Sequence, residues 1–195
     1  MRETIFQPLG MTDTDFIVPE AELPRLATPY HMYFTTELTV LDHPGFIRDP
    51  LVIPQLPSGG GGLYSTAADY GRFAQMLLNK GELDGARIVS PAAVAMMTSN
   101  QVPEALIATG FIAGTQKIGP GQGYGFNGAV FFDPEAAGSK VGTGTYQWDG
   151  AGGTWFWIDP QNQILFVGMI QRMLQEGMPR LQEMTQNLIS DALIV

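Results

Sequence analysis

From Gly119 onward, the sequence consists of short runs of β-branched and aromatic residues separated by turn-forming residues. Such runs predict strands, and turn residues between them predict where the strands end. Two of the turns fall at Asp133-Pro134 and at residues 159–162. Because parallel strands need crossovers of a dozen or more residues, these short connections predict consecutive antiparallel strands. The expected strands lie at about 123–132, 142–148, 153–159 and 163–171.

The last part of the chain predicts a helix that packs on this sheet. Apolar residues recur there at helical spacing, and polar residues fill the opposite side. The residues of this apolar stripe are Leu181, Met184, Leu188 and Ala192. We therefore expect an amphipathic helix to cover one face of the sheet.

The first part of the chain reads as a helical and irregular covering region. Residues 1–62 hold many prolines and no sustained periodicity, which predicts a short helix near residues 3–7 followed by irregular loop. Next come a helix at about 66–79, a small hairpin around Asp84-Gly85, and a helix at about 91–98. The fold class is therefore α+β, with a covering region at 1–118 and an antiparallel sheet with its C-terminal helix at 119–195.

Composition excludes several classes of function. No apolar run in the 195 residues approaches the roughly 20 needed to span a bilayer, so we expect no membrane insertion. The net charge of -9, with no local Lys/Arg cluster, makes nucleic acid an unexpected partner. With no cysteine there are no disulfides, thiolate nucleophiles or Cys-zinc sites. The cellular compartment stays open.

Several familiar patterns do not hold up in context. The glycines of residues 123–128 match G-x-G-x-x-G, but a strand rather than a helix is predicted to follow them, which argues against dinucleotide binding. The glycines of 59–62 lack the Lys and Ser/Thr of a phosphate loop. His31 and His43 are too far apart to bind a metal from one helical turn. We therefore expect no cofactor and no metal.

Residues 148–154 are dense in glycine between two predicted strands. Glycine within strands marks a bulge or a place where another group approaches the backbone. One interpretation is a tight hairpin stabilised by packing of Trp148 and Trp155. The other is a sheet edge whose amides face a ligand, and the residues alone leave both open.

Four stretches together resemble the β-lactamase and penicillin-binding-protein fold, in the branch of class C β-lactamases and esterases. They follow one another in family order and span nearly the whole chain. The stretches are residues 6–14, 58–69, 123–126 and 148–160. The resemblance implies a partial β-lactamase/transpeptidase-like fold and a serine hydrolase ancestry.

The resemblance also implies a site. Family members use a Ser-x-x-Lys nucleophile, a Tyr-x-Asn or Tyr-x-Ser tyrosine, and a third motif on a strand at the sheet edge. Trp148-Asp149-Gly150 resembles the third motif, although Asp149 replaces the glycine common in esterase-like members. By this match Ala151 supplies an oxyanion-hole amide, and Trp148, Asp149, Gly150 and Gly152 contact the substrate.

The other two motifs are absent from the sequence. No serine is followed by lysine three residues on, and no Tyr-x-Asn or Tyr-x-Ser occurs. The chain therefore resembles the C-terminal half of such an enzyme. We expect it to be inactive alone and to take a small-molecule acyl substrate only when complemented. Which parent substrate applies, whether ester, β-lactam or peptide, stays open.

The same resemblance implies a partner. In the parent fold, the strand that corresponds to residues 164–170 pairs with an N-terminal strand missing here, and a bare strand edge favours association. We therefore expect Ile164 to Ile170 to pair with a second copy of the chain or with an N-terminal half. The alternative function is a noncatalytic binding or assembly module that keeps the fold without the chemistry.

Overall fold

The computed structural model describes residues 1–33, 37–43, 47–58, 60–114, 116–174 and 177–193. Gly59, which belongs to one of the stretches that carry the family resemblance, lies outside these residues. Among the described helices, none combines the length and the apolar character that a membrane crossing requires.

An antiparallel sheet forms the centre of the molecule, as the sequence predicts, and it has five strands rather than the expected four. Its spatial order is β11-β10-β9-β8-β7. The strands are β7 (Gln122–Tyr124), β8 (Ala129–Phe131), β9 (Tyr146–Gly150), β10 (Thr154–Asp159) and β11 (Ile164–Met169). The last three strands form a continuous meander in which neighbours along the chain are neighbours in the sheet.

The predicted single strand at 123–132 is wrong, because the chain reverses inside it. β7 and β8 are the two arms of a hairpin, with Tyr124 paired to Ala129. Asn127 has a φ of 63°, and the Gly125 N–H donates to the Gly128 carbonyl at 2.8 Å, which closes the turn. Asn and Gly are the residues that accept such backbone conformations. Of the glycines that mimic a dinucleotide motif, Gly125 and Gly128 therefore belong to the turn, whereas Gly123 lies in β7.

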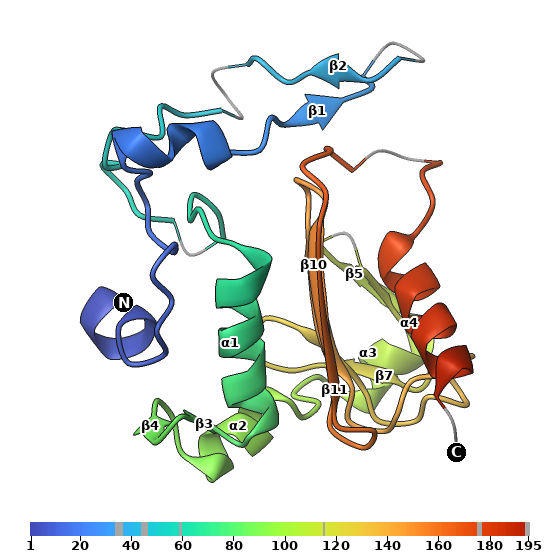
Figure 1. Ribbon diagram of the computed structural model, residues 1–195. Helices are drawn as coiled ribbons and strands as arrows, with labels where there is room; N and C mark the ends of the chain where they lie inside the picture. Colours follow the sequence, from blue (N-terminus) through green and yellow to red (C-terminus); the bar gives the residue numbers. More distant parts are fainter. Residues whose placement is uncertain (34–36, 44–46, 59, 115, 175–176, 194–195) are drawn as a thin grey trace.

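The remaining elements cover the sheet or extend from it (Figure 1). In chain order they are the π-helix η1 (Arg2–Phe6), the 3-10 helix η2 (Glu20–Arg25), β1 (Tyr30–His31), β2 (Thr39–Val40), α1 (Ala67–Leu78), β3 (Glu82–Leu83), β4 (Ala86–Arg87), α2 (Pro91–Met97), α3 (Glu104–Thr109), β5 (Phe111–Ala113), β6 (Gln116–Ile118) and α4 (Leu181–Ala192).

Local signals in the sequence account for several of these elements. Thr66 caps α1 by accepting a hydrogen bond from the Asp69 N–H, and Ser90 caps α2 in the same way from Ala93. The β3–β4 hairpin turns at Asp84 and Gly85, both with positive φ. The expectation of irregular loop throughout 8–62 is wrong, because β1 and β2 pair there.

Helices cover the two faces of the sheet, with α1 on one face and α4 on the other (Figure 1). On the α1 face, the ring of Phe156 lies 5.3 Å from that of Tyr70 and 5.9 Å from that of Tyr146. The core around these rings joins the N-terminal helix, α1 and the strands. Its fully buried members are Phe6, Leu9, Met11, Ala74, Met76, Leu77, Leu78, Val94, Tyr146, Phe156 and Ile158.

The predicted C-terminal helix is confirmed, but the face it packs with is not the predicted one. Met184 and Leu188 are 48% and 67% exposed, whereas Gln182 and Gln186 are buried. The Gln182 side chain donates to the carbonyls of Trp148 and Phe156 at 3.2 and 3.1 Å, so hydrogen bonds to the sheet orient the helix. The apolar stripe is therefore left facing outward.

Candidate functional site

The turn between β9 and β10 lies where the resemblance places the third family motif. Trp155 pairs with Asp149 across the hairpin and Phe156 pairs with Trp148, so the two tryptophans point to opposite faces of the sheet. The predicted tight hairpin is present, but the two tryptophans do not pack against each other. Trp148 instead packs edge-on against Tyr124 at 5.4 Å, on the α1 side.

Backbone hydrogen bonds hold this turn from one side. The Leu174 N–H donates to the Ala151 carbonyl at 2.7 Å, and the Ile170 N–H donates to the Gly153 carbonyl at 3.0 Å. Ala151 itself is exposed, and its N–H donates to no group among the residues that the structure describes. The peptide unit that carries this N–H is held at its other end, because the Gly150 carbonyl accepts from the Gly153 N–H at 2.9 Å. A fixed peptide unit with an open N–H is what an oxyanion-hole donor requires.

The close approach of residues 170–174 requires glycine at position 153. Gly153 has a φ of +83°, and a Cβ there would lie 2.4 Å from the Arg172 carbonyl oxygen. The neighbouring Gly152 is under neither constraint, since a Cβ there would meet nothing within 4 Å. The glycine density of the motif therefore has a structural cause at position 153.

The segment 170–174 is in turn tied to the covering region. The Tyr30 N–H donates to the Gln171 carbonyl at 2.7 Å, and the Met173 N–H donates to the Tyr30 carbonyl at 2.8 Å. Tyr30, in the covering region, thus contacts the segment 170–174, and this segment in turn holds the Ala151 turn. No local pattern in the sequence marks Tyr30 and residues 171–173 as neighbours.

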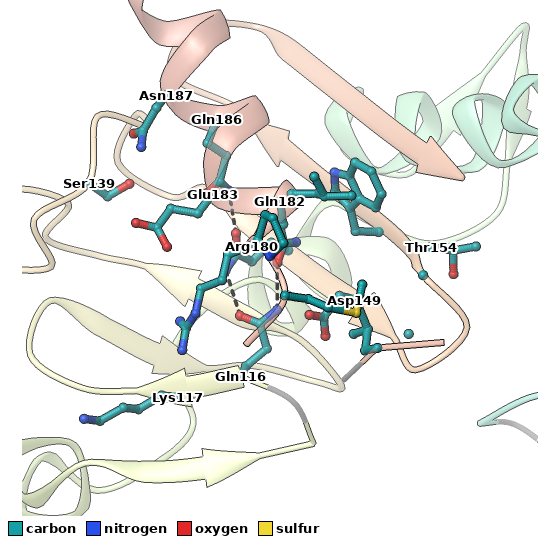
Figure 2. Close-up of a pocket in the computed structure, with 18 of the residues that line it drawn as sticks. Gln116, Lys117, Ser139, Asp149, Thr154, Arg180, Gln182, Glu183, Gln186 and Asn187 are labelled. Carbon is teal, nitrogen blue, oxygen red and sulfur yellow. Dashed lines mark hydrogen bonds between the residues drawn. The ribbon is translucent and has the colours of Figure 1, made fainter. Parts of the chain in front are cut away.

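A cavity of about 680 Å³ opens beside the turn, between the sheet, β6 and the start of α4 (Figure 2). Of the predicted site residues, Asp149 and Gly150 line it, together with Gly153 and Thr154. Trp148, Ala151 and Gly152 do not line it. Trp148 lies on the opposite face of the sheet, whereas Ala151 and Gly152 form the adjoining turn.

The cavity also brings together residues that sequence reasoning missed. The cations Lys117 and Arg180 and the anion Glu183 line it, as do five glutamines. The glutamines are Gln116, Gln122, Gln147, Gln182 and Gln186. The spacing of Gln182 and Gln186, one helical turn apart, was a usable signal that a polar face of the last helix could be functional.

Among the described residues that line this cavity, no serine belongs to a Ser-x-x-Lys motif. Ser139 lines the cavity, but its hydroxyl accepts a weak 3.5 Å hydrogen bond from the Val141 N–H, and position 142 is glycine rather than lysine. Tyr124 does not line the cavity but packs against Trp148, and burial raises the pKa of Tyr124, which favours its neutral form. Within the described residues, no cluster of three or more His, Asp or Glu side chains could bind a metal ion.

Comparisons with known proteins agree on one family. A beta-lactamase family model matches residues 1–188. Protein Rv1367c of Mycobacterium tuberculosis is 36% identical over 172 residues, which is 87% of this chain and 42% of that protein. Esterase EstB of Burkholderia gladioli is 31% identical over 174 residues, 78% of this chain and 38% of that protein.

Solved structures give the same result. EstCE1, a hydrolase with promiscuous acyltransferase activity, superposes with a TM-score of 0.75 at 28% identity, over 97% of this chain and 49% of that one. Simvastatin synthase LovD from Aspergillus terreus has a TM-score of 0.76 over 98% of this chain and 49% of that one, and at 19% identity it shows the fold alone. The chain spans about half the length of these proteins or less. Since the family model covers nearly the whole sequence, the chain belongs to the beta-lactamase family and is related to its serine hydrolases.

Proposed function

We propose that this chain is the oxyanion-donor and substrate-binding part of a serine hydrolase that transfers or hydrolyses acyl groups. The observation that carries the proposal is the open N–H of Ala151, in a turn where the Gly150 carbonyl of the same peptide unit accepts from Gly153 at 2.9 Å and the Ala151 carbonyl accepts from Leu174 at 2.7 Å. Such a donor stabilises the negative charge that develops on the carbonyl oxygen in acyl transfer, and one donor contributes about 10²–10³ in rate. Asp149, Gly150 and Gly152 lie at or beside the place where the acyl group would bind.

We assign the substrate class as an ester. The Trp148-Asp149-Gly150 motif resembles the tryptophan-containing form of esterase-like members more than the lysine-containing form of β-lactamases. The names of two relatives, an esterase and a hydrolase with acyltransferase activity, support the same class. The support comes from similarity, because much of a parental acyl pocket lies in the half of the fold that this chain does not span.

Residues 1–195 are expected to be inactive alone, because the nucleophile and base motifs are missing from the sequence. The test offers a chromogenic ester and a cephalosporin to the purified chain. The matched control is Ala151→Pro, which removes the N–H that the proposal assigns as the donor. We expect no difference between the two proteins. Turnover by the chain above that of the variant would contradict the proposal.

Complementation needs a docking surface, and two features of the chain provide one. β11 is the last strand of the described sheet on its side, so its outer edge offers backbone groups for pairing. The exposed Met184 and Leu188 of α4 add apolar surface. We propose that a polypeptide carrying the other half of the family fold pairs along residues 164–170 and brings the serine, lysine and tyrosine.

Light scattering tests this docking. An isolated chain with an open edge is expected to self-associate as its concentration rises, by pairing β11 with a second copy. Co-expression with a segment that carries Ser-x-x-Lys and Tyr-x-Asn is expected to give a stoichiometric complex instead. A well-behaved monomer at high concentration that also fails to capture such a segment would contradict the proposal.

A noncatalytic module is the second candidate, and Asp149 favours it. An anionic side chain in the oxyanion motif opposes the negative charge of the transition state. The coding sequence separates the two candidates. If neither the reading frame nor a co-expressed neighbour encodes Ser-x-x-Lys and Tyr-x-Asn, a binding or assembly role is favoured over catalysis.

A further inference from the structure

Gln116, Gln147, Gln182 and Gln186 form a hydrogen-bonded chain along one side of the cavity, which we call the glutamine ladder. Figure 2 labels Gln116, Gln182 and Gln186 of this ladder. The Gln186 amide donates to Gln147 Oε1, the Gln147 amide donates to Gln116 Oε1 at 3.1 Å, and the Gln116 amide donates to Gln182 Oε1 at 2.7 Å. The ladder joins α4, β9 and β6. It is also largely enclosed, since Gln147 and Gln186 are each 3% exposed.

The direction of every amide in the ladder is fixed from one end. Gln182 Nε2 faces the carbonyl oxygens of Trp148 and Phe156, which can only accept, so this atom must be the NH₂ group. Gln182 Oε1 must then accept from Gln116. The same constraint passes through Gln116 and Gln147, because each amide has one oxygen and one nitrogen. It follows that Gln186 donates inward with its nitrogen.

The other end of the ladder therefore presents an acceptor. Gln186 Oε1 receives no hydrogen bond from any described residue. In the described part of the chain, the side-chain polar atoms that are both fully buried and without a hydrogen-bond partner are Trp157 Nε1 and Arg172 Nε. Gln186 Oε1 is not among them, so it is not fully buried. Because Gln186 lines the cavity, its oxygen is open to that space. Gln116 and Gln147 each use one amide hydrogen in the ladder and keep a second.

The charged residues around the cavity do not determine the kind of ligand. Lys117 and Arg180 are matched in number by Asp149 and Glu183. The formal charges of these four residues therefore sum to zero. The distinctive feature is the ladder, a fixed and neutral array with an open acceptor and spare N–H donors, and a partner with the complementary groups would satisfy it.

We propose that the cavity recognises a neutral group that both donates and accepts hydrogen bonds, a carboxamide or a hydroxyl, on the bound molecule. Its N–H or O–H donates to Gln186 Oε1, and its oxygen accepts from a spare amide hydrogen of the ladder. This deepens the proposed function, on which it rests, by assigning a polar neutral substituent to the ester substrate. A carboxylate or a bare hydrocarbon at the same place fits less well.

The test measures binding to the isolated chain, which needs no nucleophile. The probes are benzamide, benzyl alcohol, benzoate and toluene, which share a ring and differ in one substituent. Side-chain amide signals of the ladder are followed by ¹H–¹⁵N NMR. We expect benzamide or benzyl alcohol to shift these signals and to bind roughly fivefold more tightly than benzoate or toluene, as one or two hydrogen bonds allow.

Two variants locate the effect. Gln186→Met keeps the length of the side chain and removes the open acceptor, so the preference for the neutral polar probes is expected to disappear. The control Asn187→Ala changes a cavity residue outside the ladder and is expected to keep the preference. Should Gln186→Met fail to fold, the comparison of the four probes on the unaltered chain still decides.

Three outcomes would overturn the inference: tighter binding of benzoate, no ladder shift with any probe up to its solubility, or an unchanged preference in folded Gln186→Met. None of these bears on whether a complemented enzyme hydrolyses esters. Conversely, a complemented enzyme without esterase activity would refute the proposed function and leave the binding result standing.

Discussion

At the scale of single residues, two adjacent glycines allow a matched test of the Ala151 turn. We expect Gly153→Ala to lower the free energy of unfolding by about 1–3 kcal/mol, because φ is positive and the added Cβ would lie 2.4 Å from the Arg172 carbonyl. Gly152→Ala has open space around the added atom and should change it by less than about 0.5 kcal/mol. Urea unfolding of the two variants measures the difference.

The same pair of variants reports on the support of the turn. If residues 170–174 hold Ala151 in place, Gly153→Ala should speed hydrogen exchange at Ile170 and Leu174, whose N–H groups donate to the turn. Gly152→Ala should leave exchange at these two residues unchanged. Equal stability and equal exchange in both variants would show that the 170–174 segment does not constrain the turn.

Sequence reasoning reached the motif at the turn but not its surroundings. Trp148-Asp149-Gly150 is contiguous, so its glycine-rich pattern could be seen directly. Tyr30 and Gln116 reach the site through long-range contacts with the 170–174 segment and with Gln182, and nothing local in their sequence marks them. Local pattern therefore found the chemistry-bearing turn, and tertiary packing decided what supports it.

At the scale of secondary structure elements, local signals predicted best where a cap or a turn decides the geometry. The helices predicted to begin after Thr66 and Ser90 and the hairpin predicted at Asp84-Gly85 are all confirmed. The run at 123–132 misled because its aromatic and glycine residues suit both a strand and a turn, and register with β9 settles the choice. Periodicity gave the wrong orientation for α4, since it assumes that the apolar face packs inward, and the contrary signal was the Gln182 and Gln186 pair one helical turn apart.

The outward apolar stripe of α4 predicts that removing it should affect association more than stability. Met184→Gln with Leu188→Gln replaces side chains that are 48% and 67% exposed, so the free energy of unfolding of the monomer should change by less than about 1 kcal/mol. The same double variant should weaken self-association and capture of the other half, because it removes apolar surface from the docking face. Analytical ultracentrifugation measures the association, and urea unfolding measures the stability.

The double variant needs a polar control on the same helix. Glu183→Gln changes an exposed side chain of α4 without removing apolar area and should leave association as it is. If the apolar double variant associates as strongly as the unaltered chain, α4 takes no part in docking and the edge of β11 alone would have to account for it.

At the scale of the whole molecule, buried tyrosines link the stability of the core to alkaline pH. Burial raises the pKa of Tyr146 to about 12, with a smaller contribution from nearby Tyr124, and burial also raises the pKa of Tyr70. Both rings pack against Phe156, in the core that joins the N-terminal helix, α1 and the sheet. Ionisation of these tyrosines would therefore destabilise the core that joins these elements.

The sign of the effect follows from where protons are released. Unfolded tyrosines ionise near pH 10, whereas Tyr146 stays protonated in the folded chain to about pH 12. Between these values the unfolded state holds fewer protons, so the contribution of Tyr146 to the free energy of unfolding should be constant below about pH 10 and should fall from there to about pH 12. Urea unfolding at pH 8, 9, 10 and 11 measures this fall.

Tyr146→Phe isolates the contribution of one ring. The Tyr146 hydroxyl donates to the Phe126 carbonyl at 2.7 Å, so the variant should lose about 1 kcal/mol at pH 8. Above pH 10 the variant should lose stability less steeply than the unaltered chain, so that the two curves converge. Tyr33→Phe, outside the core, should leave the slope unchanged, since the loss comes from a ring that the folded core keeps from ionising. Parallel curves for the unaltered chain and Tyr146→Phe from pH 8 to 11 would mean that Tyr146 ionises as readily in the folded core as in the unfolded chain.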